Sequence, residues 1–527
     1  MIHNKIKKNA SDNVQNEKVL SWFDYPVFVL LTISGLSTIL YFFYYWFSLS
    51  DLFFYPLCYT ILTLILAIII INNQGKWFLL ILMKKPRPME IKSDWKVAVV
   101  TSFVPSAESF EMLEETVKAL VALDSSHDTW VLDEGDSDRV KKICASFGAK
   151  HFSRKNLPQY QTEKGTFKCN SKHGNYNAWL GSIGFNQYDI IVAFDPDHIP
   201  SRNFLSKVLG YFEDPTVGYV QAPQAYYNQK ASFIARGAAE ETYAYYSSVQ
   251  MASYGMGYPI IVGSHNTHRA TALKQVGGFA PHDADDLLIT LLYQDRGWKG
   301  VYVPEILARG LTPVDWYSYF TQQRRWARSV LDLKFRYYPK IAGHLSFKTR
   351  LMSFLHGLNY LHQSILIFIG LLMLIYILLM GINPDAFSFS TIMNLAILCG
   401  VLQICEFYRQ RFYLDWKHEW GSHWRAGLLH LAKWPYMLMA IYEAVLNRNI
   451  PYQLTTKLKK KSGDIKLILP HLLVIVTICI FSYVNLSSHK NIHPTIYLFT
   501  LIILIGSLIP ILTNFLNFPE PFDRNLL

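Results

Sequence analysis

The chain has 527 residues, of which 51% are hydrophobic, 15% aromatic and only 17% charged. Soluble proteins carry roughly a quarter charged residues, so this composition predicts a membrane protein and excludes a disordered, collagen-like or disulfide-scaffold chain. The formal net charge is +11, but basic residues also gather at the cytoplasmic ends of membrane helices. We therefore expect a membrane protein with one substantial polar domain and no nucleic-acid partner.

Six apolar stretches are each close to the ~20 residues that cross a bilayer. They lie at residues 26–48, 52–71, 354–380, 387–407, 467–486 and 494–514. The first is too long for the apolar region of a signal peptide, and no small-residue cleavage site follows it, so we expect an anchor. Basic residues precede the first stretch and follow the second, whereas the linker between them has none. The positive-inside rule therefore places the N-terminus and the residues after 72 in the cytoplasm.

A further apolar stretch, residues 425–446, is interrupted by Lys433, Pro435 and Glu443. A seventh crossing here would export the basic loop at 448–466, so an interfacial helix is favoured. Six spans then place both termini in the cytoplasm. The predicted parts, in chain order, are a cytoplasmic segment (1–25), two transmembrane helices (26–72), a polar domain (92–340), two transmembrane helices (350–410), interfacial helices with the basic loop (411–466), two transmembrane helices (467–514) and a short cytoplasmic tail (515–527).

The polar domain alternates between strand and helix patterns. The buried-strand run at 95–103 precedes a helical stretch at 109–123, and the runs DTWVLDEG and DIIVAFDPD flank the helical run DRVKKICASFG. This order predicts an α/β domain with a mostly parallel sheet. Open sheets of this kind bind ligands just past the carboxyl ends of their strands.

Three acidic pairs lie at the ends of such elements. They are Asp133 with Glu134, Asp195 with Asp197, and Asp285 with Asp286. Any one pair alone is more typical of a helix cap or a turn. Asp195 and Asp197, however, follow a wholly apolar strand and can share a hard divalent cation, Mg²⁺ or Mn²⁺, which leaves coordination positions for phosphate oxygens.

A pentapeptide further along, Gln322-Gln-Arg-Arg325-Trp326, is by itself typical of an amphipathic surface helix. The order of acidic turn, Asp-x-Asp, acidic pair and Gln-x-x-Arg-Trp, however, resembles the processive family 2 glycosyltransferases, the group of bacterial cellulose, hyaluronan and chitin synthases. The resemblance covers residues 26–514 and is closest to a bacterial cellulose synthase catalytic subunit without a PilZ domain. Smaller matches are Lys172-His-Gly174-Asn175-Tyr-Asn177, Val220-Gln221-Ala-Pro223-Gln224, Gly263-Ser264 and Val276-Gly277-Gly278-Phe279.

The resemblance implies a GT-A-like cytoplasmic α/β domain, at 92–340, inserted in a helical bundle of the inner (plasma) membrane. It implies a UDP-sugar donor, with UDP-glucose as the default, a divalent metal and a growing polysaccharide as acceptor. Accessory export subunits are allowed. The implied function is inverting, processive synthesis of a β-linked polysaccharide, cellulose-like by default, and its secretion through the protein's own channel.

The resemblance also assigns roles to individual residues. Asp286 takes the position of the catalytic base, because its spacing to Gly297-Trp298 matches the family. The remaining assignments are Asp195 and Asp197 for the metal; Asp133, Glu134, Lys172, Asp195, Gln322 and Arg325 for the nucleotide sugar; and Asp285 and Trp326 for the acceptor.

The basic loop carries the run Tyr452-Gln-Leu454-Thr455-Thr-Lys457. It resembles the gating loop Phe-x-Val-Thr-x-Lys of cellulose synthases, in which Thr455 and Lys457 would contact the nucleotide sugar. The alternative interpretation is a basic linker on the membrane surface, since the lysine run 459–461 follows directly.

Two other functions remain open. One is a non-processive transferase that adds a single sugar to a lipid acceptor. The other is a transporter with a regulatory cytoplasmic domain, although the chain lacks the inverted repeats of many transporters. His265 and His268 are half of a metal-site pattern without a third ligand nearby in sequence.

Replacing Tyr452, Thr455 and Lys457 together by alanine should lower polymer synthesis by orders of magnitude at normal protein level. A loop that closes over the donor excludes water and reopens to release product. Replacing the lysine run 459–461 by alanine should have far less effect. Incorporation of labelled sugar by membranes measures both. If both triple variants lose the same amount of polymer synthesis, the segment is only a basic linker at the membrane surface.

Overall fold

Strand β3 (Val97–Phe103) is an interior strand of the polar domain, as its apolar run predicts. The structure is a computed structural model that describes residues 14–448, 465–488 and 492–515. In it, β3 belongs to a seven-stranded sheet. The strand order is β11 (Lys299–Tyr302), β8 (Val217–Gln221), β10 (Asn266–Arg269), β6 (Ile190–Phe194), β3, β4 (Asp128–Asp133) and β5 (Lys150–Phe152). Neighbouring strands are parallel except β10, which is antiparallel to β6 and to β8.

Helices cover both faces of this sheet, because successive strand residues point to opposite sides. Ala98 and Val100 pack in the core beneath α6 (Lys172–Trp179) and α12 (Asp285–Asp295). Val97 and Val99 pack in the core on the other face, with α8 (Phe204–Val208) and α10 (Gln250–Gly255). Further helices of the domain are α4 (Phe110–Val121), α5 (Asp138–Phe147), α7 (Phe185–Gln187), α9 (Phe233–Glu240), α11 (Ala270–Gln275), α13 (Trp316–Asp332) and α14 (Tyr338–Ile341). The predicted mixed, mostly parallel α/β sheet is confirmed.

Two small sheets complete the strand structure of the described residues. β1 (Asn16–Lys18) pairs antiparallel with β2 (Lys84–Pro86), which joins the N-terminal segment to the start of the domain. The second small sheet has the order β7 (Ile199–Pro200), β12 (Ala308–Gly310) and β9 (Ala225–Tyr226). Its strand β7 begins two residues after Asp197.

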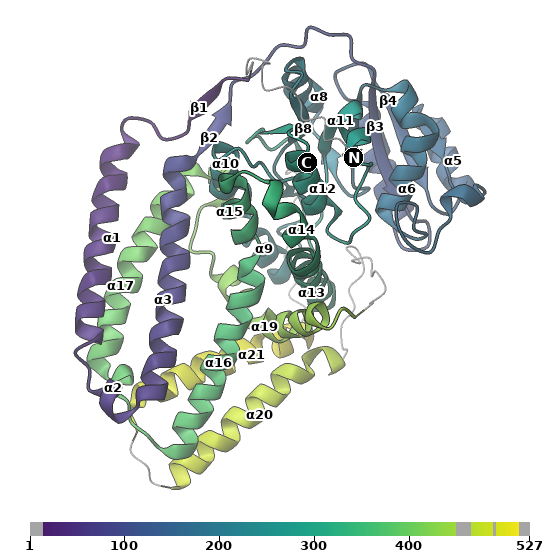
Figure 1. Cartoon of the computed structure of the whole chain (residues 1–527). Helices are drawn as coiled ribbons and strands as arrows, with labels where there is room; N and C mark the ends of the chain where they lie inside the picture. Colours follow the sequence, from purple (N-terminus) through teal and green to yellow (C-terminus); the bar gives the residue numbers. More distant parts are fainter. Residues whose placement is uncertain (1–13, 449–464, 489–491, 516–527) are drawn as a thin grey trace.

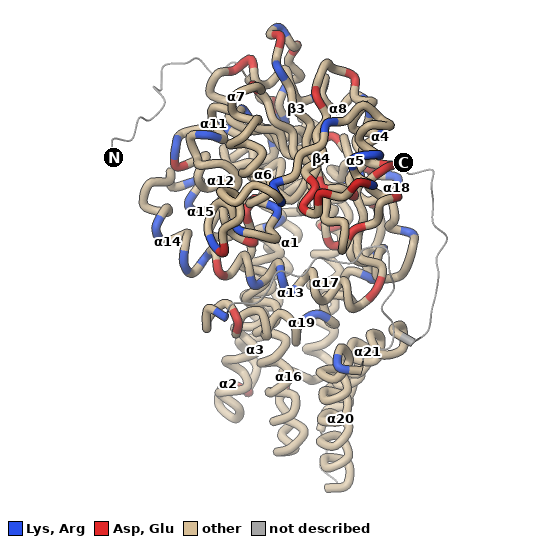
Figure 2. Tube along the Cα trace, turned by 90° about the vertical axis from the view of Figure 1, so that its right-hand side faces the viewer, with Lys and Arg blue, Asp and Glu red and all other residues tan. Residues whose placement is uncertain are grey.

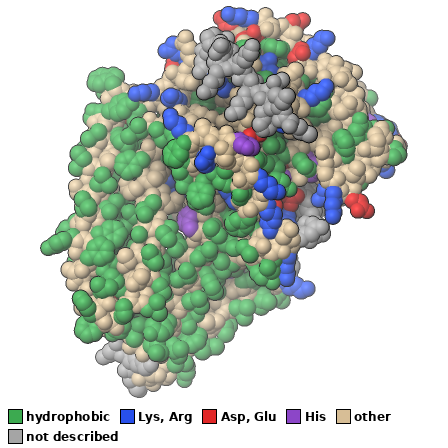
Figure 3. All heavy atoms as spheres, in the orientation of Figure 1, with side chains coloured by type: hydrophobic (Ala, Val, Ile, Leu, Met, Phe, Trp, Pro, Cys, Tyr) green, Lys and Arg blue, Asp and Glu red, His purple; other side chains and the backbone are tan. Residues whose placement is uncertain are grey.

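Six helices in the described ranges are long and apolar enough to cross a membrane, and they lie before and after the domain as predicted. They are Asp24–Trp46 (α1), Pro56–Leu82 (α3 and a 3-10 turn), Phe347–Met380 (α15 and α16), Phe389–Phe412 (α17 and a 3-10 turn), Ile465–Ser487 (α20) and Pro494–Asn514 (α21). Figure 1 shows them as one bundle beside the domain, and Figure 3 shows its outward face covered by hydrophobic side chains. Charged residues gather instead in the domain (Figure 2).

The second span differs from its predicted limits of 52–71. A short helix α2 (Asp51–Phe54) comes first, and α3 (Pro56–Phe78) begins at Pro56, where the missing N–H of proline is tolerated. The helix continues past residue 71 through a polar stretch. Trp77, near its end, is buried and stacks on Phe28 of α1 at 5.0 Å between ring centroids. Tertiary packing therefore extends the helix beyond the apolar run.

Helix α19 (Trp424–Val445) covers the stretch for which an interfacial helix is expected. It is absent from the six helices above, and its interrupting residues Lys433, Pro435 and Glu443 are all buried. It packs along α13 and α9, with the short helix α18 (Trp416–Glu419) before it. Its position at a membrane surface stays a prediction.

The packing between the domain and the second span predicts that Gly255→Ala lowers the unfolding temperature by several degrees. A Cβ on Gly255, at the end of α10, would lie 1.8 Å from the carbonyl O of Leu82. Such overpacking costs about 1–3 kcal/mol. Gly343→Ala is the matched control, because no heavy atom lies within 4 Å of a Cβ there. Size-exclusion chromatography after heating in detergent measures both, and equal unfolding temperatures would contradict this packing.

Candidate active site

The predicted functional residues meet at one edge of the sheet because of its strand directions. β3, β4 and β6 are parallel, so their carboxyl ends lie on the same edge. β10 runs the opposite way beside β6, with Asn266 opposite Ala193. Its amino end, preceded by Gly263 and Ser264, therefore lies at that edge as well. This is where open α/β sheets bind ligands.

Lys172 and Asp195 form the central ion pair of this edge. The Lys172 Nζ lies 2.5 Å from the Asp195 Oδ1, and both side chains remain partly exposed. The Asp195 backbone N–H donates to Ser264 Oγ at 2.8 Å. Burial lowers the pKa of Lys172, but the negative charges of Asp195 and Asp285 outweigh it and raise that pKa above its usual value. Lys172 is therefore a cation that faces the carboxylates from the first turn of α6.

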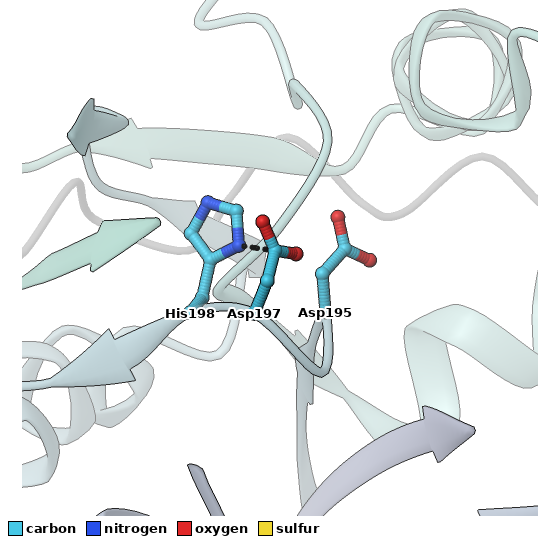
Figure 4. A group of neighbouring side chains, drawn as sticks. All are labelled: Asp195, Asp197 and His198. Atoms are coloured by element: carbon cyan, nitrogen blue, oxygen red, sulfur yellow. Dashed lines mark hydrogen bonds and ion pairs between the residues drawn. The ribbon is translucent and has the colours of Figure 1, made fainter. Parts of the chain in front are cut away.

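Asp195, Asp197 and His198 form a group that fits a divalent cation. One ligand atom from each lies within 4.8 Å of the others, and Figure 4 shows the three side chains projecting from the same turn. Asp197 is buried, lies 3.3 Å from His198 Nδ1 and accepts the backbone N–H of Leu311 at 3.2 Å. Carboxylate oxygens suit Mg²⁺ and Mn²⁺, and imidazole suits transition metals.

His198 is the member of this group that the sequence prediction missed. Its position directly after Asp197 is the sequence feature that could have identified it as a ligand. The ring is buried, and its Nε2 has no hydrogen-bond partner among the described residues. A Cβ on Gly310 would lie 2.4 Å from that Nε2, so the glycine leaves the ring its space. His265 and His268 lie outside this group: His265 Nε2 hydrogen-bonds the carbonyl of Ala222, and the two ring nitrogens of His268 bond Tyr293 and Asn266.

Asp286 stands at the start of α12 and is held by backbone N–H groups. Its Oδ2 accepts from Gly263 at 2.8 Å and its Oδ1 from Leu287 at 2.7 Å. Gly263 has a φ of +65° and also turns its carbonyl toward Lys172 Nζ, at 3.5 Å. One left-handed glycine thus links the two ends of the site.

Burial, and then the neighbouring charge of Asp285, raises the pKa of Asp286 to about 6. Burial and Asp195 also raise the pKa of Asp285, against the attraction of Lys172. Carboxylates with raised pKa values in a cleft are typical of functional sites. Asp286 is ionised at neutral pH and is a stronger base than an ordinary aspartate.

The first acidic pair is engaged in building a turn. Asp133 is fully buried, and its carboxylate accepts the backbone N–H groups of Gly135 and Ser137. Glu134 forms a bidentate pair with Arg154 at 2.6 and 3.0 Å. Contact of Asp133 and Glu134 with a nucleotide stays a prediction.

Arg154 was not foreseen from the sequence, because an isolated arginine in a polar segment gives no pattern. Its side chain is fully buried. Besides Glu134 it donates to the backbone carbonyls of Tyr160, Phe167 and Lys168 at 3.0–3.1 Å. It therefore holds the loop that leads into Lys172.

Helix α13 carries Gln322, Arg325 and Trp326, of which the first is buried and the other two are half-buried. Arg328 on this helix pairs with Asp283 at 2.5 Å, two residues before Asp285. The Gln-x-x-Arg-Trp helix is therefore attached to the segment that leads into α12. The predicted gating residues Tyr452, Leu454, Thr455 and Lys457 lie outside the described residues.

Comparisons with known proteins give matches to glycosyltransferases. Residues 101–277 match the family described as glycosyl transferase family 2, and residues 190–402 match glycosyl transferase family group 2. Cellulose synthase 2 of Novacetimonas hansenii is 27% identical over 279 residues, which are 51% of this chain and 16% of that protein. The UDP-forming cellulose synthase catalytic subunit of Pseudomonas fluorescens is 25% identical over 396 residues, 71% of this chain and 50% of that protein. The chain therefore matches at most half the length of these relatives.

A solved structure confirms the GT-A-like fold. It is a mannosyltransferase from Pyrobaculum calidifontis in complex with GDP-Man and Mn²⁺. It superposes with a TM-score of 0.50 at 14% identity, covering 74% of this chain and 99% of that one.

The cation site predicts that Asp197→Ala weakens Mn²⁺ binding by at least about tenfold, since even outer-shell changes at metal sites cost 10–100-fold. His198→Ala should also weaken it if the imidazole is a ligand. Asp94→Ala, an exposed carboxylate, is the control. Electron paramagnetic resonance of free Mn²⁺ measures the bound fraction. If these variants bind Mn²⁺ as tightly as the control variant, the cation does not bind at this turn.

Proposed function

We propose that the chain is a membrane-bound glycosyltransferase of family 2, which polymerises a β-linked polysaccharide from a UDP-sugar and secretes it across the inner membrane. The observation that carries this proposal is the arrangement of Lys172 with Asp195 on one side of Gly263 and Asp286 on the other. Transfer from a sugar diphosphate needs positive charge at the leaving group and a base at the acceptor hydroxyl. The site offers both within one network.

The leaving-group side is built by Lys172, Asp195, Asp197 and His198. A divalent cation, Mg²⁺ or Mn²⁺, held by the last three residues neutralises the diphosphate when bound. Lys172 contributes its own charge, because its ammonium stays protonated beside Asp195 and Asp285. Arg325, from α13, is proposed to approach the same diphosphate. Asp133 and Glu134 are proposed to bind the nucleoside end.

The acceptor side is built by Asp286. Its carboxylate accepts the proton of the attacking hydroxyl as the new glycosidic bond forms and the bond to the diphosphate breaks. A single base opposite the leaving group gives direct displacement, so an α-linked donor yields a β-linked product. Trp326 offers a flat apolar face for the acceptor ring, with Gln322 beside it and Asp285 next to the base.

The helical part suits export of the product. Six apolar helices among the described residues flank the domain, and the basic flanks of the first two favour a cytoplasmic domain and cytoplasmic termini. A polymer made on that side must cross the bilayer. We propose that the helices after the domain form its path, alone or with accessory export subunits.

Incubating purified membranes with a panel of labelled UDP-sugars tests the proposal. A high-molecular-weight product that a linkage-specific hydrolase degrades would support it, with UDP-glucose the first donor to try. A small labelled glycolipid would favour the non-processive transferase. Absence of transfer from every sugar would contradict the proposed function.

Asp286→Asn should abolish transfer and leave UDP affinity within about threefold of the wild type, because loss of a base affects the transition state. The asparagine can still accept the Gly263 N–H. Asp138→Asn, in the first turn of α5 and 90% exposed, is the control. If Asp286→Asn keeps activity within a few-fold of the wild type, Asp286 is not the catalytic base.

The raised pKa of Asp286 also predicts the pH dependence of the wild type. The base acts only when ionised, so turnover should fall as the pH drops through about 6 and stay level above it. An ordinary aspartate would keep activity down to about pH 4. Initial rates at saturating donor between pH 5 and 8 measure this, and a profile level down to pH 5 would contradict the assignment.

A further inference from the structure

A buried ionic cluster joins helices α9, α13 and α19 between the domain and the membrane helices. Glu241, the C-cap residue of α9, lies 2.9 Å from the Nζ of Lys433 on α19. The same Nζ donates to Gln323 Oε1 on α13 at 3.1 Å. Tyr319, one turn earlier on α13, donates its hydroxyl to Glu241 at 2.8 Å. We call these four residues the Lys433 cluster.

The Lys433 cluster is buried, and each of its charges depends on the others. The side chains of Glu241 and Lys433 are each 8% exposed. Burial raises the pKa of Glu241, and Lys433 and Tyr319 oppose that shift. Removing one partner of such a pair strands a charge, whereas neutral replacement of both is often tolerated. The contacts are therefore satisfied in one relative position of the three helices.

A second contact fixes the direction of α13 against α19. Arg324, next to Gln323, forms an ion pair with Glu443, whose side chain is 6% exposed. Lys433 and Glu443 are ten residues apart, which is about 15 Å along a helix. Glu240 adds a contact from α9 by accepting the backbone N–H of Ala426 near the start of α19 at 3.2 Å. Neighbouring residues of α13 thus contact points of α19 that are about 15 Å apart.

Helix α13 is the element that these contacts position. Gln323 and Arg324 lie between Gln322 and Arg325, and Trp326 is three residues after Gln323, on the same side of the helix. Five residues after Gln323, α13 is attached through Arg328 to Asp283, which lies three residues before Asp286 in the chain. Figures 1 and 2 both place α13 and α19 at the boundary between the domain and the bundle.

We propose that Lys433 and Glu241 are positioning residues, which fix α13 so that Trp326 presents the acceptor sugar to Asp286. This inference rests on the proposed function for its acceptor. Neither residue needs to touch the donor. Their loss should therefore lower turnover far more than UDP affinity, because Lys172 and the turn at Asp195–His198 hold the diphosphate side without α13, and only Arg325 and Gln322 of that helix contribute there.

The test uses Lys433→Met, Glu241→Gln and the double variant of the full-length protein. Each single variant should lower the kcat of polymer synthesis by at least about tenfold and leave UDP affinity within about threefold of the wild type. The double variant should recover to within about fourfold of the wild type, because no charge is left unpaired. Lys207→Met with Glu305→Gln, an exposed ion pair on the domain, is the matched control.

Hydrogen exchange of α13 gives a readout that does not depend on sugar transfer. The single variants should exchange the amides of Trp316–Asp332 at least about tenfold faster than the wild type, and the double variant should be close to it. Wild-type membranes that turn over no UDP-sugar would contradict the proposed function, and the exchange alone would then decide the inference. Three results would each overturn the inference. The single variants could match the control in turnover and exchange, they could lose UDP affinity by the same factor as turnover, or the double variant could be as impaired as the single variants.

Discussion

The antiparallel pairing of β10 between β6 and β8 is the constraint on which the site depends. Because β10 runs against its neighbours, its amino end reaches the edge where β3, β4 and β6 end. Gly263 and Ser264 therefore meet Asp195 there, although about seventy residues separate them in the chain. Gly263 then turns its N–H to Asp286 and its carbonyl to Lys172. A fully parallel sheet would place this segment at the other edge.

The charges of the site are arranged in two groups with opposite tasks. Lys172 is stabilised as a cation by Asp195 and Asp285, on the side where a diphosphate would leave. Asp286 is made more basic by burial and by Asp285, on the side of the acceptor. The charge of Asp285 acts on both Lys172 and Asp286. The same carboxylate thus supports a charged lysine and a stronger base, which suits a reaction that moves negative charge from hydroxyl to diphosphate.

The junction with the membrane helices uses buried charge instead of apolar contact alone. Apolar packing permits helices to slide by small amounts, whereas an ion pair such as Glu241 with Lys433 is satisfied in one geometry. The helix α13 lies at this junction, because Arg328 pairs with Asp283 near Asp286 and Gln323 accepts a hydrogen bond from Lys433 of α19.

The sequence by itself determined the main elements of this protein. Apolar runs gave the six long helices of the described residues, and the alternation of strand and helix patterns gave the mostly parallel sheet. These features are local, so composition and periodicity reveal them. The choice of Asp195, Asp197 and Asp286 came from the order of the acidic motifs and its resemblance to a known family, and their roles stay predictions. Only the tertiary structure decided the rest: the extension of α3 past residue 71, the approach of His198 to the two aspartates, the burial of Arg154, and the pairing of Lys433 with Glu241. Each of these depends on contacts between residues far apart in the chain or on space left by a neighbour such as Gly310, and a single sequence carries no pattern for such contacts.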